Sequence, residues 1–135
     1  MPESSRTAVE TVESCFAAIA DLDTDRLLAH YTEDYVLELP YFKPNEPLVV
    51  EGRETARPFL VATLATQRMR LTIQTSHWLP DEQLLIAEYV CDGEFLDDGE
   101  PYVNAYVGYW YFEGDLICRT REYYNPQAPR ASAID

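Results

Sequence analysis

The stretch from Asn104 to Pro126 constrains the fold most, because it has the pattern of two long strands joined by a tight turn. Apolar and aromatic side chains dominate both halves, and Glu113-Gly114-Asp115 separates them. Glycine tolerates the positive φ that such hairpin turns need. We therefore expect a β-hairpin near the C-terminus, around which the rest of the chain is organised.

An acidic side chain, Glu122, lies on the second strand of this hairpin. Side chains alternate along a strand, so one face should carry Glu122 with Cys118, Thr120 and Tyr124, and the other Arg119, Arg121 and Tyr123. An acid on a mostly apolar strand face needs a reason, because an isolated buried charge is costly. Glu122 is therefore either a structural acid with a partner or the working group of a pocket.

Length and charge narrow the possible functions. The 135 residues fit one domain, residues 1–135, which can bury enough surface to fold without a metal or a disulfide. The net charge of −14 disfavours nucleic acid and anionic membranes as partners, because both are themselves negative. The N-terminal residues are polar, and we expect neither a signal peptide nor a membrane-spanning segment.

The cysteines and the acidic residues give no sign of a metal centre. Cys15, Cys91 and Cys118 are odd in number, widely spaced and outside any CxxC motif, which predicts reduced thiols in a cytoplasmic protein. The acidic residues between positions 92 and 100 lack the spacing of a metal-binding loop, so a solvated hairpin is the better interpretation. No nucleotide-binding or zinc-protease motif occurs. We expect no metal and no cofactor.

Three helices are expected in the N-terminal half. Apolar residues at three- and four-residue spacing predict a helix over residues 5–20 with Ser4 or Ser5 as its cap. Thr24 can cap a shorter helix that reaches Tyr31. A third helix should run through Ala56 to Leu64 and begin only a few residues before Pro58, where a missing N–H is tolerated.

The strands are concentrated in the C-terminal half. The expected strands are 35–39, 48–50, 69–79, 84–95, 102–112 and 116–124, with a stiff proline-rich loop over 40–47 and a loose tail over 127–135. Helices followed by a run of antiparallel strands predict the α+β class: a cone-shaped, curved antiparallel sheet wrapped on three N-terminal helices. Such a cone leaves an interior that suits a small ligand.

The order of elements and several short segments resemble the SnoaL-like and ketosteroid-isomerase-like superfamily, also called nuclear-transport-factor-two-like. The similarity covers nearly the whole chain, and its segments are 23–27, 31–34, 38–40, 52–54, 112–117 and 121–126. The resemblance implies the cone-shaped fold and a homodimer formed through the convex sheet face. It leaves the activity open, because this fold carries isomerases, cyclases, hydrolases, dehydratases and binding modules.

The residues known from ketosteroid isomerase are missing at the matching positions. Its aspartate base, its oxyanion-binding tyrosine and its protonated aspartate fall here on Leu39, Cys15 and Gly108. The chain should therefore not be a ketosteroid isomerase. Residues 121–126 are more similar to the phenazine-biosynthesis A/B branch, and that resemblance implies that Glu122 is an acid/base group in the pocket.

Two residues are candidates for catalysis. Glu122 could transfer protons if an apolar pocket raises its pKa, and the alternative is a structural acid bonded to a neighbouring strand or to Arg121. His77, in the middle of a strand, could titrate near neutral pH, and the alternative is a half-buried histidine bonded to the backbone. Glu88 is a second acid on an apolar strand, for which pairing with Arg119 or Arg121 on the convex face is the favoured interpretation.

Six residues are candidates for ligand binding. Asn104, Tyr106 and Trp110 share a strand face with Gly108, which leaves room for a ligand or for strong bending. Tyr124 shares the face of Glu122, and Tyr41 and Phe42 could roof the pocket mouth. The alternatives are that the strand aromatics are core residues and that the loop aromatics pack on a partner.

Three functions remain open. The first is a cofactor-independent acid/base enzyme of isomerase, cyclase, dehydratase or condensation type, acting on a small apolar oxygenated metabolite. The second is a non-catalytic module that binds a small molecule in the same pocket. The third is a homodimeric interaction module that uses the convex face, which carries both aromatic and charged side chains.

Overall fold

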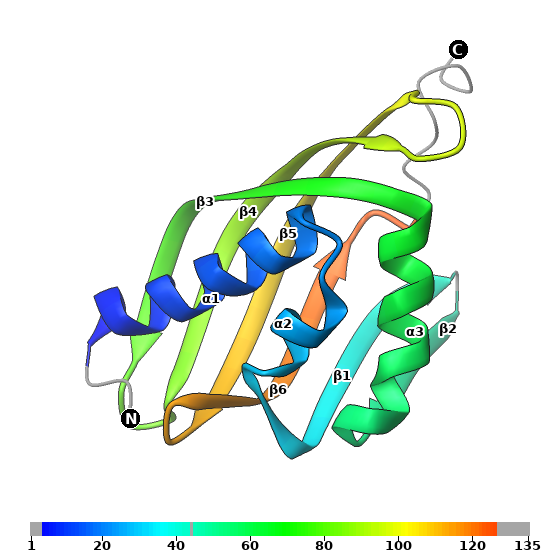
Figure 1. Ribbon diagram of the computed structural model, residues 1–135. Helices are drawn as coiled ribbons and strands as arrows, with labels where there is room; N and C mark the ends of the chain where they lie inside the picture. Colours follow the sequence, from blue (N-terminus) through cyan, green and yellow to red (C-terminus); the bar gives the residue numbers. More distant parts are fainter. Residues whose placement is uncertain (1–3, 44, 127–135) are drawn as a thin grey trace.

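The computed structural model describes residues 4–43 and 45–126, and it shows three helices against one curved six-stranded sheet (Figure 1). The helices are α1 (Ser5–Ala20), α2 (Thr24–Leu28) and α3 (Arg53–Thr66). The strands are β1 (Tyr31–Lys43), β2 (Glu46–Glu51), β3 (Gln67–Leu79), β4 (Leu84–Phe95), β5 (Pro101–Glu113) and β6 (Leu116–Tyr124). The expected α+β class is confirmed. The expected tail, 127–135, lies outside the described residues.

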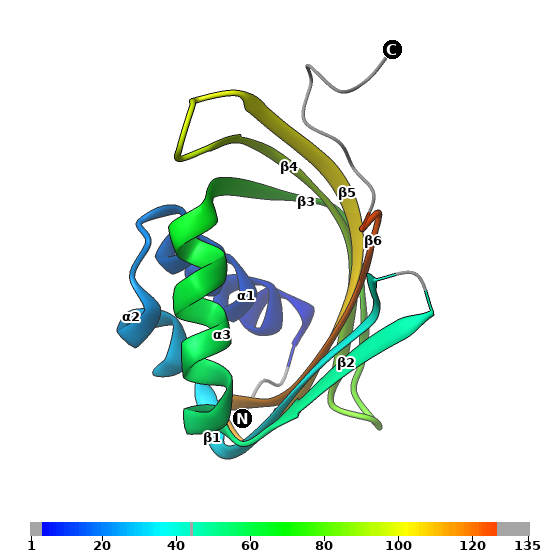
Figure 2. The same ribbon diagram turned by 90° about the vertical axis from the view of Figure 1, so that its right-hand side faces the viewer.

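The sheet bends around the helices like the wall of a cone. Its strand order is β2-β1-β6-β5-β4-β3, and every neighbouring pair is antiparallel except β1 and β6. All three helices lie on the concave side, as Figure 2 shows. Since β6 and β5 lie in the middle of the sheet, the inward side chains of the C-terminal hairpin face the interior of the cone.

Helix α1 has the N-terminal cap and the buried apolar stripe that its sequence predicts. Ser4 caps it by accepting a hydrogen bond from the Thr7 backbone N–H at 3.3 Å. Its apolar stripe is buried, with Val12 fully buried and Phe16 almost so. The helix packs mainly across β3 and closes one side of the cone (Figure 1).

Two local predictions for the N-terminal half are wrong. The second helix ends at Leu28 instead of Tyr31, because Tyr31 pairs with Ile117 of β6 and already belongs to β1. The proline-rich segment is not a loop: β1 continues through Pro40 to Lys43. Pro40 is tolerated because the β1–β2 register is interrupted between Leu39 and Lys43, so the missing N–H removes no regular ladder bond.

The four C-terminal strands match the predicted ranges within two residues, but the hairpin contains an irregularity. Tyr111 pairs with Arg119 and Phe112 with Ile117, which leaves Cys118 as an extra residue in a β-bulge. The bulge shifts the alternation, so Ile117 is fully buried and Cys118 only half-buried. The prediction that Cys118 continues the inward face of Glu122 is therefore wrong.

On the convex face the arginines of β6 pair with an acid other than the one predicted. Arg119 and Arg121 both bind the Glu38 carboxylate, the second through Nε at 3.4 Å. Glu88 instead accepts a hydrogen bond from the Thr75 hydroxyl at 2.8 Å. The expected outward direction of the arginines is observed, but the expected pairing with Glu88 is wrong, because β1 lies next to β6 and β4 does not.

Candidate functional site

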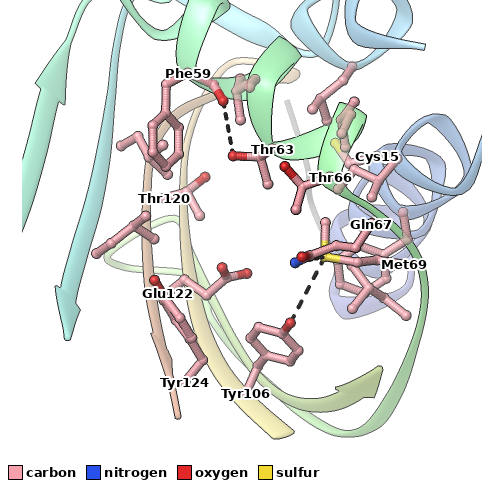
Figure 3. Close-up of a pocket in the computed structure, with 18 of the residues that line it drawn as sticks. Cys15, Phe59, Thr63, Thr66, Gln67, Met69, Tyr106, Thr120, Glu122 and Tyr124 are labelled. Carbon is pink, nitrogen blue, oxygen red and sulfur yellow. Dashed lines mark hydrogen bonds between the residues drawn. The ribbon is translucent and has the colours of Figure 1, made fainter. Parts of the chain in front are cut away.

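A cavity of about 320 Å³ lies inside the cone, between the helices and the concave face of the sheet. Its wall is mostly apolar and aromatic, with side chains from all three helices and from four of the six strands, β1, β3, β5 and β6. The Glu122 carboxylate points into this space from β6 (Figure 3). The described residues that line the cavity include no lysine, arginine or histidine, so Glu122 faces no cationic partner there.

Glu122 is held by a hydrogen bond from a tyrosine two strands away. Glu122 pairs with Gly108 on β5, and Tyr89 on β4 donates its hydroxyl proton to Glu122 Oε2. Burial raises the pKa of the Glu122 carboxyl above its ordinary value, and the Tyr89 hydrogen bond offsets part of that increase. Burial also raises the pKa of Tyr89, so this hydroxyl stays protonated and remains a donor.

A glycine makes room for the aromatic wall beside Glu122. A Cβ atom on Gly108 would lie 2.5 Å from the Trp110 ring, so this ring occupies the space that a side chain would otherwise take. Trp110 is buried and lines the cavity. Gly108 thus leaves space for the indole on β5, and the space that the sequence predicted at Gly108 is filled by the protein's own ring.

Stacked rings fix the direction of Tyr89. Its ring is parallel to that of Tyr106, with centroids 4.9 Å apart, and it also contacts Phe16 at 5.0 Å and Trp110 at 5.4 Å. Tyr89 is 1% exposed, so it has little freedom to turn away. Because aromatic contacts of this kind restrain both rings, the hydroxyl that holds Glu122 is oriented before any ligand arrives.

A second series of hydrogen-bonded polar side chains, Asn104, Tyr102 and Tyr106, ends at the cavity wall. Asn104 Nδ2 donates to the Tyr102 hydroxyl at 3.0 Å, and the Tyr102 and Tyr106 hydroxyl oxygens are 2.8 Å apart. Tyr106 then donates to the sulfur of Met69 at 4.0 Å, a weak contact (Figure 3). Burial raises the pKa of Tyr106, so it keeps its proton and can offer it to a ligand oxygen.

The structure brings most of the predicted site residues together. Glu122, Tyr106, Trp110, Phe42 and Tyr124 all line the cavity. Phe42 packs edge-on against Phe59 of α3 at 5.8 Å, which forms part of the wall between β1 and α3.

Three predicted site residues lie elsewhere. Asn104 is buried, but its side chain bonds to the backbone of Asn125 and to Tyr102, and it secures the end of β6. Tyr41 is 57% exposed and contacts Tyr123 on the outer face of the sheet. His77 is exposed on β3 and does not line the cavity, so its expected position in the pocket is wrong.

A β-bulge explains the position of His77. Ile73 pairs with Tyr89 and Thr75 with Glu88, so Gln74 is an extra residue in β3. In a regular strand His77 would share the inward face of Met69 and Leu71. The extra residue reverses the alternation and turns His77 outward.

Sequence reasoning missed Tyr89 and the polar residues Thr63, Thr66 and Gln67 at the α3–β3 junction, all of which lie in or beside the cavity. Tyr89 could have been found, because it alternates with the exposed Glu88 and must therefore face inward. The junction residues gave no comparable signal, since their position depends on how α3 sits over the sheet.

Three further findings concern the described residues, 4–43 and 45–126. No group of three or more histidine, cysteine, aspartate or glutamate side chains in that part of the chain could hold a metal ion. Among the helices seen there, none has the length and apolar character needed to cross a membrane. Cys15, Cys91 and Cys118 are free thiols.

The raised pKa of Glu122 predicts a pH-dependent stability. A carboxyl whose pKa is raised by folding stabilises the protein below its unfolded pKa, and that contribution is lost as pH rises through the folded pKa. Between these two values the free energy of unfolding of the wild type should fall relative to Glu122→Gln by up to about 1.4 kcal/mol per pH unit. Urea unfolding of both proteins from pH 4 to pH 9 measures this difference, and parallel pH profiles would contradict it.

Comparison with known protein families identifies the family of this chain. Residues 12–120 match the SnoaL-like domain, so the chain belongs to the SnoaL-like domain family. This finding confirms the superfamily predicted from the sequence. The match does not test whether the chain belongs to the phenazine-biosynthesis A/B branch, so that part of the resemblance stays a prediction.

Individual relatives are similar over most of their length. The uncharacterised protein YesE of Bacillus subtilis strain 168 is 27% identical over 120 residues, which are 88% of this chain and 82% of YesE. A crystal structure from Bacillus subtilis, provisionally named an isomerase, has a TM-score of 0.83 and 26% identity, covering 91% of this chain and 89% of its own. A provisionally named polyketide cyclase from Silicibacter sp. TM1040 has a TM-score of 0.69 and 26% identity, covering 86% and 87%.

Proposed function

We propose that the protein is a cofactor-independent enzyme of isomerase or cyclase type, in which Glu122 transfers a proton within an apolar substrate. The observation that carries this proposal is the carboxyl group of Glu122, the one acid among the described lining residues, which points into a mostly apolar cavity and has a raised pKa. The SnoaL-like family and the relatives named as an isomerase and a polyketide cyclase support the same class of reaction. The proposed substrate is a small, uncharged, oxygenated molecule.

In the proposed reaction the Glu122 carboxylate removes a proton from a carbon next to a carbonyl group. The bonding electrons of that C–H bond move into the substrate, and negative charge develops on the carbonyl oxygen. The protonated carboxyl then returns the same proton to another atom of the substrate, so no net proton or electron is consumed. A raised pKa suits this role, because the carboxyl must hold the proton between the two steps.

The Tyr106 hydroxyl is the proposed donor to the developing negative charge. Its present acceptor is the Met69 sulfur, which a substrate oxygen would replace with a stronger hydrogen bond. The Tyr102 and Asn104 side chains behind it fix the orientation of the Tyr106 hydroxyl through hydrogen bonds. Tyr89 is the proposed positioning residue, because it acts on the substrate only through Glu122.

Hydrogen exchange tests the proposed reaction without knowledge of the natural substrate. The protein is incubated in D₂O with a panel of neutral bicyclic ketones and 1,3-diketones, and proton NMR follows deuterium uptake next to the carbonyl group. Uptake that depends on the protein and saturates with ketone concentration supports the proposal. Ketones that bind without any protein-dependent exchange would contradict it.

A non-catalytic binding module is the second candidate. Its support is that Cys15, Leu39 and Gly108 replace the three polar residues expected of ketosteroid isomerase, while the cavity itself is retained. In this case Glu122 and Tyr106 would bind ligand oxygens but transfer no proton. Native mass spectrometry of protein from its host distinguishes the two, since a retained, unaltered ligand is expected only of a binding module.

A homodimer through the convex sheet face is a further proposal. Val103 is 65% exposed there, and beside it lies a half-buried cluster in which Tyr109 contacts Tyr123 at 6.0 Å with Arg121 over the Tyr109 ring at 5.5 Å. Aromatic and arginine side chains are enriched in protein interfaces. A monomer at micromolar concentration in sedimentation analysis would count against this proposal.

The cytoplasmic location of the protein stays a prediction.

A further inference from the structure

Thr120 carries a buried hydroxyl group that has no hydrogen-bond partner among the described residues. Its side chain is on β6, is 5% exposed, and lines the cavity two residues before Glu122. Burial raises the pKa of Tyr35, and a contact with the Thr120 hydroxyl offsets part of that increase, so the two hydroxyl groups are neighbours. The geometry between them is nevertheless not that of a hydrogen bond. Buried hydroxyl groups are nearly always paired, so this exception needs an explanation.

A ligand oxygen is the explanation that the location favours. Thr120 and Glu122 point to the same side of the strand, about 6.6 Å apart along it, and both face the cavity (Figure 3). A hydroxyl group can donate and accept, so Thr120 can bind either a carbonyl or a hydroxyl oxygen. A ligand that places a C–H group at Glu122 and the neighbouring carbonyl oxygen at Tyr106 can therefore place a second oxygen at Thr120.

The other polar groups of the wall limit what the ligand can be. The Thr63 and Thr66 hydroxyls each donate to a helix carbonyl, of Phe59 and of Ala62, at 2.9 Å, so toward the cavity they can only accept. The described lining contains no cationic side chain that would compensate a ligand carboxylate. A negative ligand would also face the Glu122 carboxylate, which costs free energy in an apolar site.

We infer that the Thr120 hydroxyl forms a second polar subsite, and that the ligand is an uncharged, largely apolar molecule with two separate oxygen functions, one at Tyr106 beside Glu122 and one at Thr120. This inference rests on the proposed function, because it assumes that this cavity is where the ligand binds. It adds a residue that selects the substrate, and it excludes carboxylates as substrates.

The first test concerns stability and needs no ligand. Thr120→Val keeps the shape of the side chain and removes an unpaired hydroxyl, so the melting temperature should stay unchanged or rise. Thr32→Val is the matched control: Thr32 is also buried on a strand, but its hydroxyl donates to Asp34 Oδ1 at 2.8 Å, so this variant should melt several degrees lower. A fall for Thr120→Val as large as the control's would show that Thr120 is structural and would overturn the inference.

The second test compares ligands with one and two oxygen atoms by isothermal titration calorimetry. The wild type should bind 1,3- or 2,6-dihydroxynaphthalene about tenfold more tightly than 2-naphthol, and should not bind 2-naphthoate measurably. Thr120→Val should lose the preference for the second oxygen, and Thr120→Ser, which keeps the hydroxyl, should retain it. An unchanged preference in Thr120→Val, or no binding of any uncharged probe to the wild type, would contradict the inference.

The outcomes separate this inference from the proposed function. If Glu122 transfers no proton, hydrogen exchange is absent while the dependence of binding on Thr120 remains. If Thr120 forms no subsite, exchange persists in the wild type and Thr120→Val binds the dihydroxy compounds as the wild type does.

Discussion

Glu122→Gln is expected to lower the turnover of the hydrogen-exchange reaction, measured by proton NMR, by about a hundred- to ten-thousandfold. This is the range that a positioned acid/base group contributes. Glutamine has nearly the same shape as glutamate and can still accept the Tyr89 hydrogen bond through its amide oxygen. It cannot take up a proton at neutral pH. The loss should therefore appear in kcat, with ligand affinity changed by less than about threefold, as for a group that acts in the transition state.

Glu88→Gln is the matched control for this experiment. It makes the same substitution on β4, one residue from Tyr89, but on an exposed side chain that does not line the cavity. Its turnover should equal that of the wild type. Turnover of Glu122→Gln at the wild-type level would rule out Glu122 as the proton-transfer group, and equal losses in both variants would indicate a general effect of charge.

Gly93→Ala is expected to destabilise the protein by about 3 kcal/mol or more, which is a fall of about 10 °C or more in melting temperature. A Cβ atom on Gly93 would lie 2.0 Å from the backbone carbonyl oxygen of Arg68 on β3, which is far too close for any contact. Because the obstacle is backbone, no side-chain rotation can relieve it, and β3 and β4 would have to separate. Thermal unfolding monitored by circular dichroism measures the effect.

Gly114→Ala separates this clash from the general cost of replacing a glycine. Gly114 has a φ of +63° in the β5–β6 turn, and a Cβ atom there would meet nothing within 4 Å. Its replacement should cost only the left-handed backbone strain, about 1–2 kcal/mol. If Gly93→Ala were no more destabilising than Gly114→Ala, the close approach of β3 and β4 would not exist in solution.

Much of the fold was predictable, because its strands and helices follow local patterns of apolar residues. The N-terminal helix, the third helix and the four long strands have the signals of their own periodicity, and the turn at Gly114 has its glycine. The errors occur where pairing with a distant strand overrides a local signal. Tyr31 joins β1 because β6 pairs with it, and Pro40 is accepted in a strand because the ladder is already irregular there.

The site was predictable only in part, for reasons of register. The direction of Glu122 follows from alternation, since no bulge lies between Thr120 and Tyr124. The direction of His77 does not, because the bulge at Gln74 reverses the alternation, and a bulge of this kind leaves no clear mark in the sequence. The hydrogen bond from Tyr89 crosses β5 at Gly108, so it depends on three strands at once and could not be read from any one of them.

The pKa of Glu122 in the folded protein tests the central claim most directly. Protein labelled with ¹³C at the glutamate carboxyl carbon is titrated by NMR, and the Glu122 resonance is assigned by its absence in Glu122→Gln. We predict a midpoint clearly above the ordinary glutamate value, and a further rise in Tyr89→Phe, which lacks the hydroxyl that lowers this pKa. A midpoint at the ordinary value would show that the carboxyl is solvated, and it would contradict the account of an acid/base group shielded from water inside the cavity.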